Sequence, residues 1–266
     1  MKTNQPLLAA ALLAAGAMAA RADVTVNTIT AGRASVMDVT GTGVSHFKGN
    51  RMRTDSLMGN RTSALIVDID ARRFVDIDDK KKSALVTPLD SISDELAKVG
   101  VGELTSSLTK TSQVKKIAGY SCTVHDINVT MPFSLTGNPG DGMDANMVLA
   151  GTVCLSRDAP GLADYQQFYR ASADSGFIFG DPRGVKSPTG AATAKAYAAL
   201  TRKMAEAGMA LESHVKISAQ GANPMAQMMS KLAASDITTT VTSITAGDLP
   251  AESFDVPAGY KVKTQK

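Results

Sequence analysis

Residues 63–88 read SALIVDIDARRFVDIDDKKKSALVTP, and their alternation of apolar and polar side chains is typical of short antiparallel strands. Leu65, Val67 and Ile69 are expected on one face of the first strand, because side chains alternate along a strand with period two. Val75 and Ile77 should continue an apolar face on the second strand. The charged turn at residues 79–82 then leads to a third strand, and the stretch predicts a β-meander.

The same alternation predicts an acidic face on the opposite side of the meander. Its members would be Asp68, Asp70, Asp76 and Asp78. Several carboxylates together could bind Ca²⁺, but the spacing is not that of an EF-hand loop. Arg51 and Arg53 precede the meander on an adjoining strand, where cross-strand pairing would neutralise the acids. We therefore favour a solvated, salt-bridged face over a cation site.

Strand patterns continue on both sides of the meander, and helical patterns interrupt them. Further strands are predicted over residues 24–30, 35–40, 44–47, 51–55, 112–118, 120–131, 147–156, 211–219 and 237–245, and residues 254–262 close the chain. Helices are predicted over residues 90–99, from near Asp158, over 191–207 and, on a weaker pattern, over 224–234, with an exposed loop at 136–144. The fold class is α+β: one large, curved antiparallel β-sheet, a half-open β-barrel, with two or three inserted helices.

The N-terminus has the three parts of a secretory signal peptide. Lys2 supplies the positive charge, residues 7–20 form a short apolar run, and Ala20-Arg21-Ala22 is a small-x-small cleavage pattern. The apolar run is shorter than the roughly 20 residues that a membrane-spanning helix needs. We expect cleavage after Ala22, with Asp23 as the first mature residue, which predicts a periplasmic protein whose residues 23–266 form one domain.

Composition limits the classes of partner and site. After loss of Lys2 and Arg21, the mature chain has 26 basic against 25 acidic residues, which is not the balance of a nucleic-acid-binding protein. Cys122 and Cys154 remain as its two cysteines. In an oxidising compartment they are expected to form a structural disulfide, with two separate buried thiols as the alternative.

Several short motifs resemble those of one protein family. They are Lys48–Asp55 (KGNRMRTD), Ile66-Val67-Asp68 followed by Asp79–Lys82, Gly119–Cys122 (GYSC) and Phe254–Tyr260 (FDVPAGY). In this order the motifs resemble a family of exported bacterial proteins of unknown function that is related to the periplasmic lipoprotein carriers LolA and LolB. The resemblance implies a half-closed β-barrel with helices packed into its mouth and a cavity that shelters acyl chains. The family often has a tryptophan near Thr152–Cys154, which this chain lacks.

No residue pattern points to catalysis, a metal or a cofactor. The chain has no G-x-S-x-G nucleophile motif, and the G-D-P-R-G-V-K-S run at residues 180–187 lacks P-loop spacing. His46, His125 and His214 are far apart in the sequence, whereas a zinc site needs three or four suitably spaced ligands. Methionines 204, 209, 225, 228 and 229 could bind Cu(I) through their thioethers, but methionine also fills irregular cores and lines adaptable binding surfaces.

The leading functional hypothesis is a non-enzymatic periplasmic protein that binds a lipid, an acylated protein or another apolar ligand. Tyr165, Phe168, Leu200 and Met204 form the apolar stripes of two helices expected to cover the sheet, and they are the candidate cavity residues. The plainer interpretation is that these side chains complete the core. A protein-interaction or envelope-sensing module without lipid is the second hypothesis, and methionine-based copper binding is the third.

Overall fold

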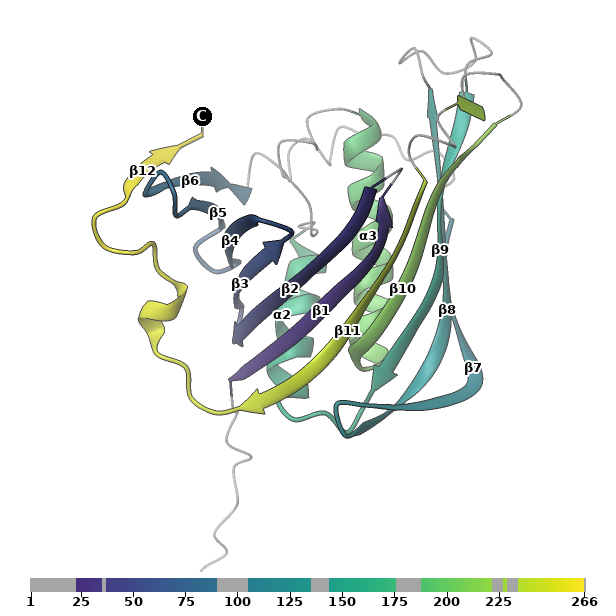
Figure 1. The fold of residues 1–266 in the computed structure, drawn as a ribbon, viewed down its shortest axis with the longest axis horizontal. Coiled ribbons are helices and arrows are strands. Elements are labelled where there is room, and N and C mark those ends of the chain that lie inside the picture. The colour runs from purple at the N-terminus through teal and green to yellow at the C-terminus, as the bar shows by residue number, and fades with distance from the viewer. Residues whose placement is uncertain are drawn as a thin grey trace, which may run out of the picture.

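A twelve-stranded sheet dominates the computed structural model, and its strand order is β12-β6-β5-β4-β3-β2-β1-β11-β10-β9-β8-β7 (Figure 1). The structure describes residues 23–34, 37–89, 105–134, 144–175, 188–221, 227–228 and 234–265. The strands are β1 (Val24–Ala34), β2 (Met37–Lys48), β3 (Arg51–Met58), β4 (Arg61–Asp68), β5 (Arg73–Asp78), β6 (Ser83–Pro88), β7 (Thr105–Ile117), β8 (Tyr120–Ser134), β9 (Asp144–Ser156), β10 (Met209–Gln220), β11 (Ser235–Ala246) and β12 (Lys261–Thr264). The helices are α2 (Leu162–Asp174) and α3 (Pro188–Ala207), with a short 3₁₀ helix η2 (Ala251–Phe254).

The sheet is open and mixed, so the α+β class is confirmed and the purely antiparallel expectation is wrong at one edge. β12 pairs with β6 in parallel, whereas every other neighbouring pair is antiparallel. The sheet does not close, because β12 and β7 stand at its two ends. The C-terminus reaches β6 from the end of β11 by running along the outside of the hairpins, and it arrives in the parallel direction (Figure 1).

Both described helices lie on one face of the sheet (Figure 1). Residues paired across neighbouring strands share a face. The row Val24, Phe47, Met52 and Val67 packs with α2, and Val153, farther along the sheet, packs with α3. This side is called the helix face below.

Two strand predictions that stopped at glycines need correction. Residues 35–40 and 44–47 were expected as separate strands, but β2 runs unbroken through Gly41 and Gly43. A Cβ at Gly43 would lie 2.8 Å from the Thr28 hydroxyl, so this glycine allows close strand packing and does not break the strand. β7 likewise begins well before the predicted residue 112.

The meander of β4, β5 and β6 is present, but its predicted faces are wrong. Asp68 pairs with Arg73, and Leu65 pairs with Asp76. In each pair of this ladder an odd-numbered residue faces an even-numbered one. Odd-numbered residues of β4 therefore share a face with even-numbered residues of β5. Leu65 and Val67 lie on the helix face, whereas Val75 and Ile77 lie on the opposite face.

The four aspartates consequently do not form one acidic face. Asp68 lies opposite the helix face beside Arg73, and Asp76 lies on the helix face. Asp70, in the following turn, accepts a hydrogen bond from Asn50, and Asp78 binds Lys81. Asp70 is thus bound by a residue of the neighbouring β2–β3 turn and Asp78 by a residue of its own turn, and the expected shared surface is absent from the described meander.

α2 begins later than its sequence pattern predicts. The helix was expected from near Asp158 with Pro160 in its first turn, but it starts at Leu162, and Gly161 is its N-cap. Gly161 has a left-handed φ of 69°, and its backbone packs so closely on Val24 that a Cβ would overlap that side chain. The predicted helix over 191–207 corresponds to α3, which starts at Pro188.

Several sequence predictions lie outside the described residues. They are the signal peptide at 1–22, the helix at 90–99, most of the loop at 136–144 and nearly all of the weakly patterned segment at 224–234. In the part of the chain that the structure covers, no helix is both long enough and apolar enough to cross a membrane.

The predicted disulfide is confirmed. Cys122 and Cys154 are bonded, with their Cα atoms 5.3 Å apart. Cys154 pairs with Val124 in the β8–β9 ladder, so the bond joins diagonal neighbours on one face. It staples two strands in the half of the sheet that carries α3.

A C-terminal strap, residues 247–265, crosses the face opposite the helices and ends as β12 (Figure 1). Arg51 lies 5.0 Å from the ring of Phe254, which is completely buried, and Arg53 donates to the Ser253 carbonyl. Tyr260 donates to Asp79. The strap thus joins three of the motifs that carry the family resemblance, and these contacts give the motifs a structural role.

Candidate functional site

Tyr165 and Phe168 lie on α2 in an aromatic cluster at one end of the helix face. The Phe47 ring centroid is 5.3 Å from that of Tyr165 and 5.6 Å from that of Phe168. Both α2 side chains are buried in the largest core cluster. Burial raises the pKa of the Tyr165 phenol, and burial together with the nearby Tyr165 raises that of Tyr169 further. Both phenols are therefore neutral hydrogen-bonding groups at physiological pH.

Leu200 and Met204 lie on α3 in a different core cluster. Leu200 is buried, and Met204 packs beside it against apolar residues of β8, β9 and β10. The four predicted cavity residues are therefore on the helix face, but the structure separates them into two pairs. Tyr165 and Phe168 complete the core under α2, whereas Leu200 and Met204 form part of an apolar wall under α3.

Between these clusters, the helix face carries small side chains from β1 and β2. We call Thr28, Thr30, Gly41, Gly43 and Ser45 the small-residue strip. Register places these residues on the helix face, because Ser45 pairs with Val26 and the β1 residues alternate with it. All five are half-buried. No side chain of the strip is larger than threonine, so the strip offers little steric bulk above the sheet.

The hydroxyl groups of the strip are paired with polar atoms of neighbouring strands. Thr30 shares a hydrogen bond of 3.1 Å with Thr239, and Ser45 shares one of 2.9 Å with Thr54. Thr28 donates to the Gly43 carbonyl at 3.3 Å. A hydroxyl that is already hydrogen-bonded within the protein costs little free energy to remove from water, so an apolar molecule can cover these groups.

The strip continues across the sheet into the apolar wall. Thr30 pairs with Thr239, Thr239 with Ser213, and Ser213 with Val153. Val153 is buried in the cluster under α3. Its partly buried neighbours there include Met147, Tyr197, Met204, Val215 and Ile217. One continuous face therefore joins small, paired polar groups to a large apolar surface.

The sequence alone does not mark the small-residue strip as a site. The available signals are Thr-Ile-Thr at 28–30 and Gly-Thr-Gly at 41–43. Their alternation indicates strands, but only the register with β11 and β3 shows that the hydroxyls of Thr30 and Ser45 pair with hydroxyls of those neighbouring strands.

Metal-binding hypotheses receive no geometric support among the described side chains. In that part of the chain, no group of three or more His, Cys, Asp or Glu residues could hold a metal. Burial lowers the pKa of His46, which hydrogen-bonds Thr25, and His214 contacts Asp236. Of the methionines considered for copper, Met209 is buried in the α2 cluster and Met204 packs in the α3 cluster. Met225 and Met229 lie outside the described residues.

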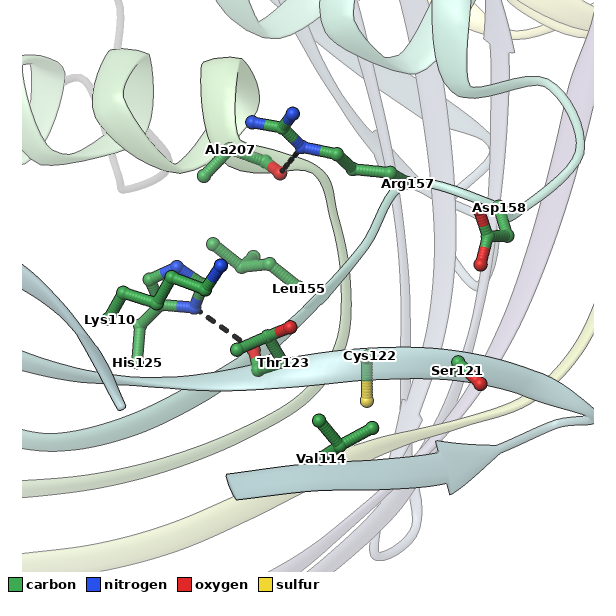
Figure 2. A pocket seen from close by; sticks show the side chains of 10 residues that line it. All are labelled: Lys110, Val114, Ser121, Cys122, Thr123, His125, Leu155, Arg157, Asp158 and Ala207. Carbon is green, nitrogen blue, oxygen red and sulfur yellow. Dashed lines mark hydrogen bonds between the residues drawn. The ribbon is translucent and has the colours of Figure 1, made fainter. Parts of the chain in front are cut away.

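A separate pocket of about 280 Å³ lies near the C-terminal end of α3 (Figure 2). It is lined by Lys110, Val114, Ser121, Cys122, Thr123, His125, Leu155, Arg157, Asp158 and Ala207. Arg157 donates through Nε to the Ala207 carbonyl, and His125 Nδ1 donates to the Thr123 carbonyl. The pocket therefore combines fixed polar groups with a few apolar side chains.

Comparison with known proteins adds no assignment. No protein-family model matches the chain, and no curated protein matches it.

Proposed function

We propose that the protein is a periplasmic, non-enzymatic binding protein that holds a lipid or an acyl chain on the helix face. The LolA-like resemblance of its motifs agrees with this role, and so does a curved open sheet with helices on one side. The disulfide is compatible with an exported protein.

The observation that carries the proposal is the small-residue strip beside the apolar wall. An acyl chain gains roughly 0.8 kcal/mol for each CH₂ group that leaves water. A strip without bulky side chains leaves space for such a chain, and its paired hydroxyls reduce the cost of excluding water. Binding of this kind requires no catalytic residue.

A tryptophan substitution on each face tests the site. The chain contains no tryptophan, so the fluorescence of the single indole in T30W or T42W is free of background from other tryptophans. Thr30 lies on the strip, whereas Thr42 is exposed on the opposite face of the neighbouring strand. T42W therefore adds the same ring to the same hairpin, outside the proposed site.

The probe is a brominated monoacylglycerol, whose bromine atoms quench a nearby indole. We expect saturable quenching in T30W and none in T42W. Native mass spectrometry of the wild-type protein with the same probe should show a bound adduct. If the indole instead blocks the strip, T30W loses the adduct while T42W retains it, which supports the same site. Absence of the adduct from the wild-type protein, or equal quenching in both variants, would reject the proposal.

A further inference from the structure

The pocket near the end of α3 is lined by two positively charged side chains, Lys110 and Arg157. Lys110 and the terminal nitrogens of Arg157 make no ion pair within the described part of the chain. Nearby Lys115, by contrast, is paired with Glu212. Both unpaired cations line the same pocket, so their charges act on the same small volume.

His125 adds a polar group whose orientation is fixed. Only 8% of the residue is exposed, and it stands directly opposite Lys110 in the β7–β8 pairing. Because Nδ1 donates to the Thr123 carbonyl at 3.0 Å, Nδ1 carries a proton and Nε2 is left for another partner. Figure 2 draws Lys110 and His125 at the same end of the pocket.

The acidic member of the lining is Asp158. In Figure 2 its carboxylate lies at the end of the pocket away from Lys110 and His125. Arg157 is held by its Nε bond to the Ala207 carbonyl, which leaves the two outer nitrogens of the guanidinium for a ligand. Those nitrogens can donate to two oxygens of one anionic group.

We propose that this pocket binds a phosphate or another compact oxyanion, whose oxygens accept hydrogen bonds from Lys110 and Arg157 and whose hydroxyl donates to Nε2 of His125. A volume of about 280 Å³ suits a small group and not a whole lipid. Leu155 and Ala207 belong both to the pocket lining and to the apolar cluster under α3. The anion is therefore either a free oxyanion or the head group of an amphiphile whose chain lies under α3. Only the second source rests on the proposed function.

Calorimetric titration with inorganic phosphate, dodecyl phosphate and dodecanol tests the site and separates these sources. Variant K110Q removes a cation that makes no ion pair within the described residues, and K110Q/R157Q removes both cations. The matched control K116Q/R170Q removes two exposed cations, one from β7 and one from α2, outside the pocket. We expect phosphate or dodecyl phosphate to bind the wild-type protein and the control equally. K110Q/R157Q should bind about tenfold more weakly or worse, as expected for lost charge-assisted hydrogen bonds, and K110Q should already show a loss.

Tighter binding of dodecyl phosphate than of phosphate identifies a head group, and equal binding identifies a free oxyanion. Dodecanol has the alkyl chain but no phosphate, so its binding tests the apolar site alone and should be equal in all variants. Failure of the lipid-binding proposal can therefore be told apart from failure of the anion-site proposal. No saturable binding of either phosphate compound, or equal weakening in the control and the pocket variants, would overturn the anion site.

Discussion

Asp23, the predicted first residue of the mature chain, has a structural role that its position in the sequence does not reveal. Its carboxylate is buried, binds the Lys48 amine and accepts a hydrogen bond of 2.8 Å from the Leu249 backbone. Lys48 in turn donates to the Leu249 carbonyl. A single carboxylate therefore connects the start of β1, the end of β2 and the start of the C-terminal strap.

We expect D23N to lower the free energy of unfolding by about 1–3 kcal/mol, because it weakens a partly buried, charge-assisted bond and leaves Lys48 without its counter-charge. Urea unfolding followed by circular dichroism measures this change. D78N is the control, since Asp78 forms an exposed pair with Lys81 and its loss should be too small to measure. Equal midpoints for the two variants would contradict the role assigned to Asp23.

At the scale of elements, Gly161 determines where α2 begins and how closely it meets β1. Its left-handed backbone turns the chain from β9 into the helix, and the absence of a Cβ lets the turn rest on Val24. This contact sets the position of Tyr165 and Phe168 over Phe47, because they follow one and two turns later on the same helix face.

We expect G161A to destabilise the protein by about 2–4 kcal/mol, because a left-handed alanine is strained and its methyl group overlaps Val24. The variant G119A separates the cost of backbone strain from the cost of steric overlap. Gly119 also has a positive φ, but nothing lies within 4 Å of its Cβ position. It should therefore show the backbone cost alone, about 1 kcal/mol in the same unfolding measurement. A loss in G161A no larger than in G119A would show that the packing on Val24 is unimportant.

At the scale of the whole molecule, the two halves of the sheet are secured by different means. The β3–β6 half is covered on both faces, by the core under α2 on one side and by the C-terminal strap on the other. The Cys122–Cys154 bond joins β8 to β9, the strands that contribute to the apolar wall, and both cysteines are buried in the core cluster that includes α2. A break in the disulfide should therefore loosen the part of the sheet that contains both the apolar wall and the anion pocket.

We expect C122S/C154S to lower the free energy of unfolding by about 3–4 kcal/mol, the chain-entropy value for a closed loop of this length. Its sequence separation is 32 residues. Reductant should destabilise the wild-type protein by a similar amount and leave the double variant unchanged. Hydrogen exchange should rise first in β8 and β9. If reductant had no effect on wild-type unfolding, the bond would have no part in stability.

Some features follow from the sequence alone because they depend on local periodicity and composition. The alternation of apolar residues predicted most strands, the 191–207 pattern predicted α3, and two cysteines in a chain with an expected signal peptide predicted their bond. The motifs at residues 48–55 and 254–260 marked segments that the structure brings together.

Other features depend on contacts between distant segments, and only the tertiary structure decided them. The register of β4 against β5 decided which residues share a face. Odd-numbered residues of β4 pair with even-numbered residues of β5, so the apolar residues of the two strands lie on opposite faces. The packing of β1 between β2 and β11 paired hydroxyls of the strip with those of a neighbouring strand, and the meeting of β7, β8 and β9 with the end of α3 formed the pocket. Periodicity specifies which side chains share a face within one strand, whereas the partner that each face meets is set by pairing over the whole chain.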